Sequence, residues 1–159
     1  MKPTSAFADG VAIAMKYSNY ADDISIPLRW EPVPGARSYV VVVEGPDAKP
    51  VAPFVHWAAY NIPANMTNLP KGLQKQPRLT EPEGMLQGRN LRGSIGWFGP
   101  RPPVGDPPYH YHVQVLALDT VLDVLPGADR DRVLAAARGH VVAKGRIIGT
   151  FQQTTQPLK

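Results

Sequence analysis

The chain has 159 residues, of which 18 are proline, 14 are glycine and none is cysteine. Proline at roughly twice its usual share of about 5% argues against a helical bundle, because an interior proline breaks a helix. Hydrophobic residues make up 43% and charged residues 19%, which is enough apolar surface for a folded core. We therefore expect residues 1–159 to form a single, loop-rich, mainly β domain.

The formal net charge is +4, and the basic residues are spread along the chain, with Arg89 and Arg92 the nearest approach to a cluster. Nucleic-acid binding usually needs basic residues gathered on one face, so no nucleic-acid partner is expected. The lack of cysteine excludes disulfides, a thiol nucleophile and a cysteine-based zinc site. The N-terminal residues lack the apolar region of a secretory signal, and no apolar run approaches the ~20 residues of a membrane span. We expect a cytoplasmic protein without an integral membrane segment.

Taken in chain order, the predicted strands are short and are bounded by proline or glycine. Residues 11–15 form a short candidate strand. Residues 37–44 contain an unbroken run of aromatic and β-branched residues from Tyr39 to Val43, which predicts a strand buried on both faces. Residues 54–61 predict another strand, which Ile62 and Pro63 close.

The stretch from 84 to 108 combines many glycines with five prolines near its end and two aromatic residues, Trp97 and Phe98. A loop of this length in a compact domain is usually functional or disordered. Because proline lowers the entropy cost of ordering a loop, we interpret this one as a stiffened, aromatic wall.

Three elements are predicted in the remainder of the chain. Residues 109–118 alternate and then become apolar, which predicts a strand, and residues 145–151 form a further short candidate. Between them, residues 129–138 predict a helix with Asp129 as the N-cap and a stop at Arg138 and Gly139.

Nucleotide-binding motifs are absent, because no Gly-x-x-x-x-Gly-Lys-Ser/Thr sequence occurs and residues 93–96 fit neither a dinucleotide fingerprint nor a nucleophile elbow. We therefore expect no cofactor. Among the histidines, His110 and His112 share one face of a strand, and Tyr109 and Tyr111 share the other. Ordinary surface packing is favoured over metal binding for the two histidines. His56 lies in an apolar strand, where a polar side chain needs a partner or a cavity.

Five blocks of the sequence, at residues 41–48, 55–63, 93–106, 111–119 and 139–150, occur in an order that resembles the phosphatidylethanolamine-binding protein family and its bacterial Raf-kinase-inhibitor-like branch. Residues 41–48 are similar to the strand that leads into the family's Asp-Pro-Asp-Ala-Pro segment, and residues 55–63 to its His-Trp-x-x-x-Asn-Ile/Leu-Pro block. Residues 93–106 resemble its Gly-Tyr-x-Gly-Pro-x-Pro-Pro-x-Gly turn. Residues 111–119 and 139–150 resemble the last two blocks.

This resemblance implies an antiparallel Greek-key β-sandwich with one or two short helices near the C-terminus and a shallow anion pocket at one end. The implied ligand-binding residues, carried over by position, are Asp47, Phe54, His56, Phe98, Pro102, Pro103, Tyr109 and Tyr111. Trp57, next to His56, is expected to face the opposite side of its strand and to belong to the core.

Several positions depart from the family pattern. The first aspartate of the acidic segment is Gly45, its final proline is Lys49, and the usual His-Arg-Tyr triplet is Tyr109, His110 and Tyr111. Replacing an acceptor and a cationic donor in this way predicts a more neutral and more aromatic pocket that keeps His56.

The favoured function is therefore the non-catalytic binding of a small anionic or apolar organic ligand, such as a phospholipid head group. One alternative is an enzyme of a biosynthetic pathway that acts on a small organic substrate, with His56 as acid or base and Tyr109 or Tyr111 as a donor. A second alternative is regulation of a protein partner, such as inhibition of a kinase or protease.

Overall fold

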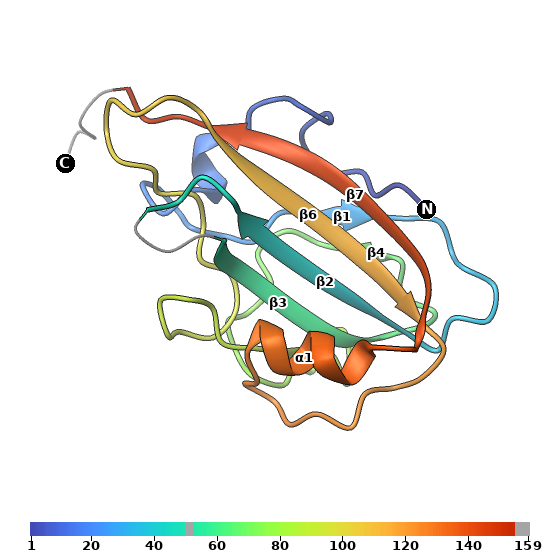
Figure 1. Cartoon of the computed structure of the whole chain (residues 1–159). Coiled ribbons are helices and arrows are strands. Elements are labelled where there is room, and N and C mark those ends of the chain that lie inside the picture. Colours follow the sequence, from blue (N-terminus) through green and yellow to red (C-terminus); the bar gives the residue numbers. More distant parts are fainter. Residues whose placement is uncertain (50–52, 155–159) are drawn as a thin grey trace.

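The computed structural model describes residues 1–49 and 53–154, in which an antiparallel five-stranded sheet lies between a two-stranded sheet and a helix (Figure 1). The larger sheet has the strand order β5-β3-β2-β6-β7, and β1 pairs with β4 in the smaller one. The elements are the 3-10 turn Met15–Tyr17, β1 Leu28–Arg29, β2 Ser38–Gly45, β3 Phe54–Pro63, β4 Asn68–Leu69, β5 Leu86–Gln87, β6 Tyr109–Leu118, α1 Arg130–Ala137 and β7 Val141–Phe151. The expected antiparallel β-sandwich with a short helix near the C-terminus is confirmed.

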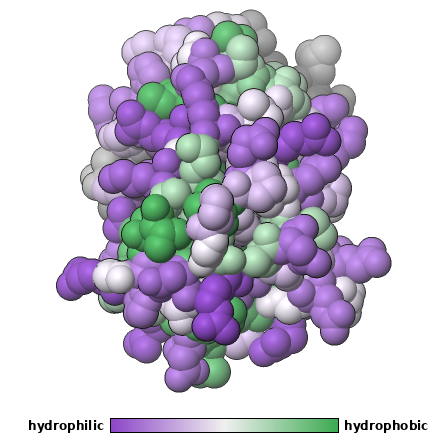
Figure 2. Space-filling model, turned by 90° about the vertical axis from the view of Figure 1, so that its right-hand side faces the viewer, coloured by the Kyte–Doolittle hydropathy of each residue, from purple (hydrophilic) through white to green (hydrophobic). Residues whose placement is uncertain are grey.

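Strand β2 is the centre of the sheet and is buried on both faces, as its apolar sequence predicts. Val41 and Val43 face the smaller sheet, where they pack with Leu28 of β1 and Leu69 of β4. The other face of β2 packs against Val133 and Ala137 of α1. Two separate apolar clusters therefore hold the three layers together, and the hydrophobic effect acts on both sides of one strand. Figure 2 shows that hydrophilic residues dominate one outer face of the molecule, with apolar residues gathered in small patches.

Helix α1 has the N-terminus that the sequence predicts, because the Asp129 carboxylate accepts a hydrogen bond from the Arg132 backbone N–H at 2.9 Å. The helix ends at Ala137, and Gly139 adopts a positive φ of 82° just beyond it. An ion pair between Arg130 and Glu44 of β2, at 3.1 Å, ties the start of the helix to the sheet.

We expect Asp129→Ala to lower the free energy of unfolding by about 1 kcal/mol, because the first turn of α1 loses its side-chain acceptor. Equilibrium unfolding in urea measures this change. Asp129→Asn keeps an acceptor oxygen at the same place and should cost a few tenths of a kcal/mol. An equal loss in the two variants would contradict the capping role.

One sequence prediction about secondary structure is wrong, and another is too short. Residues 11–15 do not form a strand: Ala12 makes an isolated bridge to Thr150, and a 3-10 turn begins at Met15. The Ser18 hydroxyl and backbone N–H both donate to the Met15 carbonyl, at 2.7 and 2.9 Å, which favours the turn over an extended chain. The candidate strand at residues 145–151 is confirmed but too short, because β7 begins at Val141, which already pairs with Leu118 of β6.

Two irregularities interrupt the pairing of β3 with β2. The pairing with β2 passes from Val43–Trp57 to Glu44–Val55, so His56 is the extra residue of a β-bulge. A second shift lies near Asn61, whose φ is 51° and whose side chain bonds the backbone of Leu122. Bulges re-aim side chains and recur beside functional sites.

Candidate functional site

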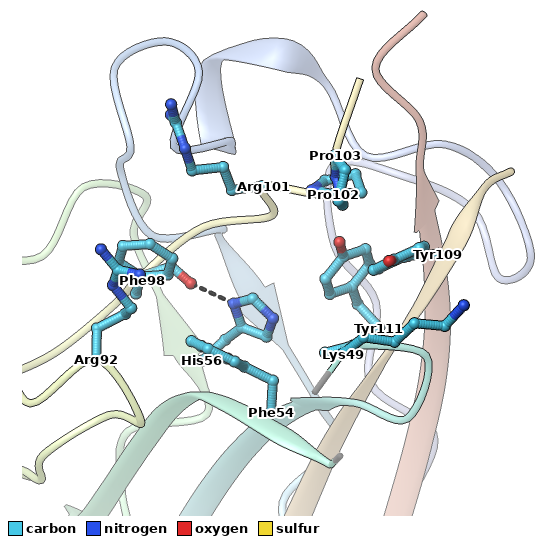
Figure 3. Close-up of a pocket in the computed structure, with 11 residues that line it drawn as sticks. Lys49, Phe54, His56, Arg92, Phe98, Arg101, Pro102, Pro103, Tyr109 and Tyr111 are labelled. Atoms are coloured by element: carbon cyan, nitrogen blue, oxygen red, sulfur yellow. Dashed lines mark hydrogen bonds between the residues drawn. The ribbon is translucent and has the colours of Figure 1, made fainter. Parts of the chain in front are cut away.

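A cavity of about 180 Å³ opens at one end of the larger sheet, where β2 ends and β3 and β6 begin (Figure 3). Its floor is aromatic: the ring centroids of His56 and Phe54 lie 4.7 Å apart, and those of His56 and Tyr111 lie 5.1 Å apart. The described lining residues are Ala48, Lys49, Phe54, His56, Arg92, Phe98, Arg101, Pro102, Pro103, Tyr109 and Tyr111. The predicted binding residues thus come together here, with the exception of Asp47.

The bulge at His56 overturns one detail of the sequence prediction. Strict alternation would send His56 and Trp57 to opposite faces, but the extra residue lets both point to the inner face of the sheet. Trp57 is fully buried between the sheets and contacts Trp97 edge to face, with ring centroids 5.7 Å apart. His56 meets the Tyr111 ring at the pocket instead.

Phe98 forms two hydrogen bonds with His56, one to its backbone and one to its ring. The Phe98 backbone N–H donates to the His56 carbonyl at 2.9 Å, and His56 Nδ1 lies 2.6 Å from the Phe98 carbonyl oxygen. A carbonyl oxygen only accepts, so the ring carries its proton on Nδ1 and leaves a lone pair on Nε2. The side chain is 5% exposed, and this burial lowers the pKa of His56 to about 4. The imidazole is therefore neutral at pH 7.

The wall that carries Phe98 is fastened to an N-terminal segment, residues 17–23, that the sequence did not connect with the pocket. Gly99 approaches this segment so closely that an added Cβ would overlap the Tyr17 carbonyl oxygen and lie 2.8 Å from Asp23 Oδ1. The Asp23 carboxylate in turn binds Lys75 Nζ at 2.9 Å. The bonds between the two segments are Trp97 Nε1 to Tyr17 O (3.0 Å), Gly99 N to Asp23 Oδ1 (2.6 Å), Asn19 N to Pro100 O (2.9 Å) and Tyr20 Oη to Pro102 O (2.6 Å).

Three cationic residues surround the mouth of the cavity, and the sequence analysis missed them as pocket residues. Arg92 stacks over Phe98, with its guanidinium carbon 5.4 Å from the ring centroid, and Arg101 stacks over Tyr20 at 4.5 Å. Lys49 lies across the cavity, beside Tyr111 (Figure 3). The mouth of the cavity is therefore cationic, whereas its floor is neutral and aromatic. The sequence offers one indication that Arg101 lies at the pocket, namely its position inside the proline-rich turn.

The predicted alternation along β6 is confirmed: Tyr109 and Tyr111 line the cavity, whereas His110 and His112 point away from it. Tyr109 Oη donates to Asp106 at 2.8 Å, and burial raises the pKa of Tyr111. Asp47 does not line the cavity, because its carboxylate accepts from the backbone N–H of His110 at 2.7 Å and pairs with that residue's ring at 2.8 Å.

Neither a metal cluster nor a membrane helix is found in the part of the chain that the structure describes. No three His, Asp or Glu side chains lie close enough together there to hold a metal ion. No helix in residues 1–49 or 53–154 is long and apolar enough to cross a membrane.

Comparisons with known proteins agree with this fold. Residues 3–152 match the model of the family described as phosphatidylethanolamine-binding protein. A UPF0098 protein of Pyrococcus abyssi is 40% identical over 154 residues, which cover 96% of this chain and 85% of the relative. Crystal structures of a putative phosphatidylethanolamine-binding protein homologue from Chlamydia trachomatis (34% identity, TM-score 0.84) and of YbcL from E. coli (30% identity, TM-score 0.86) are also similar. The alignments cover 96% and 95% of this chain and 97% of each of those chains.

The antiparallel sandwich with a pocket beyond its strand ends is thus the architecture of a known class of β proteins. The chain belongs to the phosphatidylethanolamine-binding protein family.

Proposed function

We propose that this protein binds a small anionic ligand in the cavity above His56, without transforming it. The charge of the cavity supports the proposal: Lys49, Arg92 and Arg101 surround the mouth, and no acidic side chain is among the described lining residues. Cations at the mouth attract an anion, and the apolar floor strengthens their interaction with it by lowering the local dielectric.

The size of the cavity limits the ligand. Pockets for drug-sized molecules have volumes of about 300–1,000 Å³, and this cavity has about 180 Å³. A phosphate or carboxylate group with a few attached atoms fits that space. The acyl chains of a phospholipid do not, so a lipid would enter by its head group alone.

The state of His56 favours binding over catalysis. A general base works best when its pKa lies near the working pH, whereas burial lowers the pKa of His56 to about 4. At neutral pH such an imidazole is a weak base and carries no proton on Nε2 to donate. The enzymatic alternative, with His56 as acid or base and Tyr109 as donor, therefore receives no support from this group.

Titration with sodium phosphate and with phosphoethanolamine, followed by NMR of labelled protein at pH 7, tests the proposal. We expect saturable shifts of the His56, Phe98 and Tyr111 signals. Shifts spread over unrelated surface residues, or none at millimolar ligand, would contradict it.

Arg92→Gln should weaken phosphate binding about fivefold, because a charge-assisted hydrogen bond contributes about 1.5–3 kcal/mol when buried and less at an exposed mouth. Isothermal titration calorimetry measures the affinity. Arg89→Gln is the matched control, since Arg89 lies in the same loop, is exposed and does not line the cavity. Equal weakening in both variants would show that only the net charge of the protein matters.

A further inference from the structure

The ring nitrogen His56 Nε2 is a polar atom of the pocket floor that the described residues leave without a hydrogen bond. Nδ1 is occupied by the Phe98 carbonyl, and no described side chain or backbone group donates to Nε2. The His56 ring lies against the carbon atoms of the Phe54 and Tyr111 rings, and the Tyr111 hydroxyl makes no hydrogen bond to Nε2 (Figure 3). A bound ligand shields Nε2 from water, and a shielded acceptor without a donor is costly, so a ligand that supplies the donor gains by binding here.

Gly45 is the residue that leaves this nitrogen open. A Cβ built on Gly45 would lie 3.6 Å from His56 Nε2, 3.6 Å from Tyr111 Cδ1 and 3.4 Å from the His110 carbonyl oxygen. These are ordinary van der Waals distances, so a side chain at this position would fit and would extend over Nε2. Any acidic side chain there would occupy the nitrogen and favour its protonation.

We infer that His56 Nε2 accepts a hydrogen bond from the ligand, and that the pocket therefore selects small oxyacid anions that keep an O–H, such as hydrogen phosphate, over fully deprotonated anions of the same shape, such as sulfate. This inference rests on the proposed function, and it adds a selectivity to it. The cations Lys49, Arg92 and Arg101 attract either anion, whereas the floor distinguishes them: a sulfate oxygen would face the Nε2 lone pair with no proton between them.

The charge state of His56 agrees with this assignment. The groups that face the ring are the Phe54, Phe98 and Tyr111 rings, with the Asp23 carboxylate beyond the wall and the three cations at the mouth. Burial outweighs the hydrogen bond to the Phe98 carbonyl and the attraction of Asp23, and it lowers the pKa of His56 to about 4. The lone pair on Nε2 is thus available throughout the neutral range.

The first test compares hydrogen phosphate with sulfate at pH 7.5 and equal ionic strength, by calorimetry on the full chain. We expect phosphate to bind at least about tenfold more tightly, because the mismatched anion leaves a buried acceptor unpaired. Equal affinities would overturn the inference and leave the proposed function standing. Binding of neither anion would contradict the proposed function itself.

The second test changes Gly45. Gly45→Asp should abolish the preference for phosphate and raise the pKa of His56, because the new carboxylate occupies Nε2. Gly45→Ala adds a methyl group at ordinary contact distance, 3.6 Å from Nε2, but no carboxylate to occupy the nitrogen, and should keep the preference. Nitrogen chemical shifts of the His56 ring in the unmodified protein give a readout independent of any ligand: we expect a protonated Nδ1 and an unprotonated Nε2. The opposite tautomer, or an unchanged preference in Gly45→Asp, would overturn the inference.

Discussion

Gly99→Ala is expected to lower the free energy of unfolding by about 3 kcal/mol or more, the upper range for an overpacked site. The added methyl group would overlap the Tyr17 carbonyl oxygen and crowd Asp23 Oδ1 at 2.8 Å and the Asn19 backbone nitrogen at 3.0 Å. Two of these three neighbours are backbone atoms, so they cannot rotate away. The wall must move off the N-terminal segment, and the hydrogen bond from Gly99 N to Asp23 is lost with it. Urea unfolding measures the loss.

The same variant should also weaken ligand binding, because the wall carries Phe98 and thereby holds the His56 ring. Asp23→Asn perturbs the same contact less. It keeps an acceptor for Gly99 N but removes the charge, so we expect it to fold and to lower the free energy of unfolding by about 1 kcal/mol. Gly45→Ala is the control for stability, because its new methyl group meets only ordinary contacts. A stability of Gly99→Ala within 1 kcal/mol of the parent would show that the wall adapts and does not depend on this close approach.

The strands and the helix were predictable because their patterns are local. Residues 37–44 could be identified as a strand buried on both faces from apolar continuity alone, and Asp129 as an N-cap from its place before a helical stretch. The alternation of Tyr109 and Tyr111 with the two histidines likewise follows from the two-residue repeat of any strand. Most of the residues that line the pocket were predicted from a family resemblance rather than from such local patterns.

What escaped prediction depends on contacts between distant parts of the chain. The bulge at His56 inserts one residue into a regular strand, and nothing in the apolar run around it indicates where pairing slips. The hydrogen bond from Gly99 N to the Asp23 carboxylate joins residues 76 positions apart. Arg92 and Arg101 are exposed residues in irregular loops, so no periodicity places them at the cavity. Gly45 could be recognised as a departure, but its closeness to His56 Nε2 required coordinates.

Acid should destabilise the protein between about pH 6.5 and pH 4, by about 3 kcal/mol from His56 alone. Burial lowers the pKa of this histidine to about 4 in the folded chain, while in the unfolded chain it stays near its ordinary value of about 6.5. Between these values the unfolded state binds more protons than the folded state. Stability is therefore fully present above pH 6.5 and is lost as the pH falls toward 4.

His56→Asn separates this effect from other titrations, because its amide nitrogen can still donate to the Phe98 carbonyl while the titrating ring is gone. We expect the variant to be less stable at pH 7, through lost packing, yet to show a much flatter dependence of unfolding free energy on pH between 6.5 and 4.

The pKa of His112 is also lowered by burial, but that side chain is more exposed, so His112→Asn should remove only a minor part of the slope. Lowered carboxylate pKa values, such as that of Asp47, act below this window. Urea midpoints measured across the pH range test this prediction. A pH slope retained in His56→Asn, or an NMR titration midpoint of His56 near 6.5 in the parent protein, would contradict it. Either result would mean that the His56 imidazole is solvated, which would exclude the dry floor on which the proposed selectivity depends.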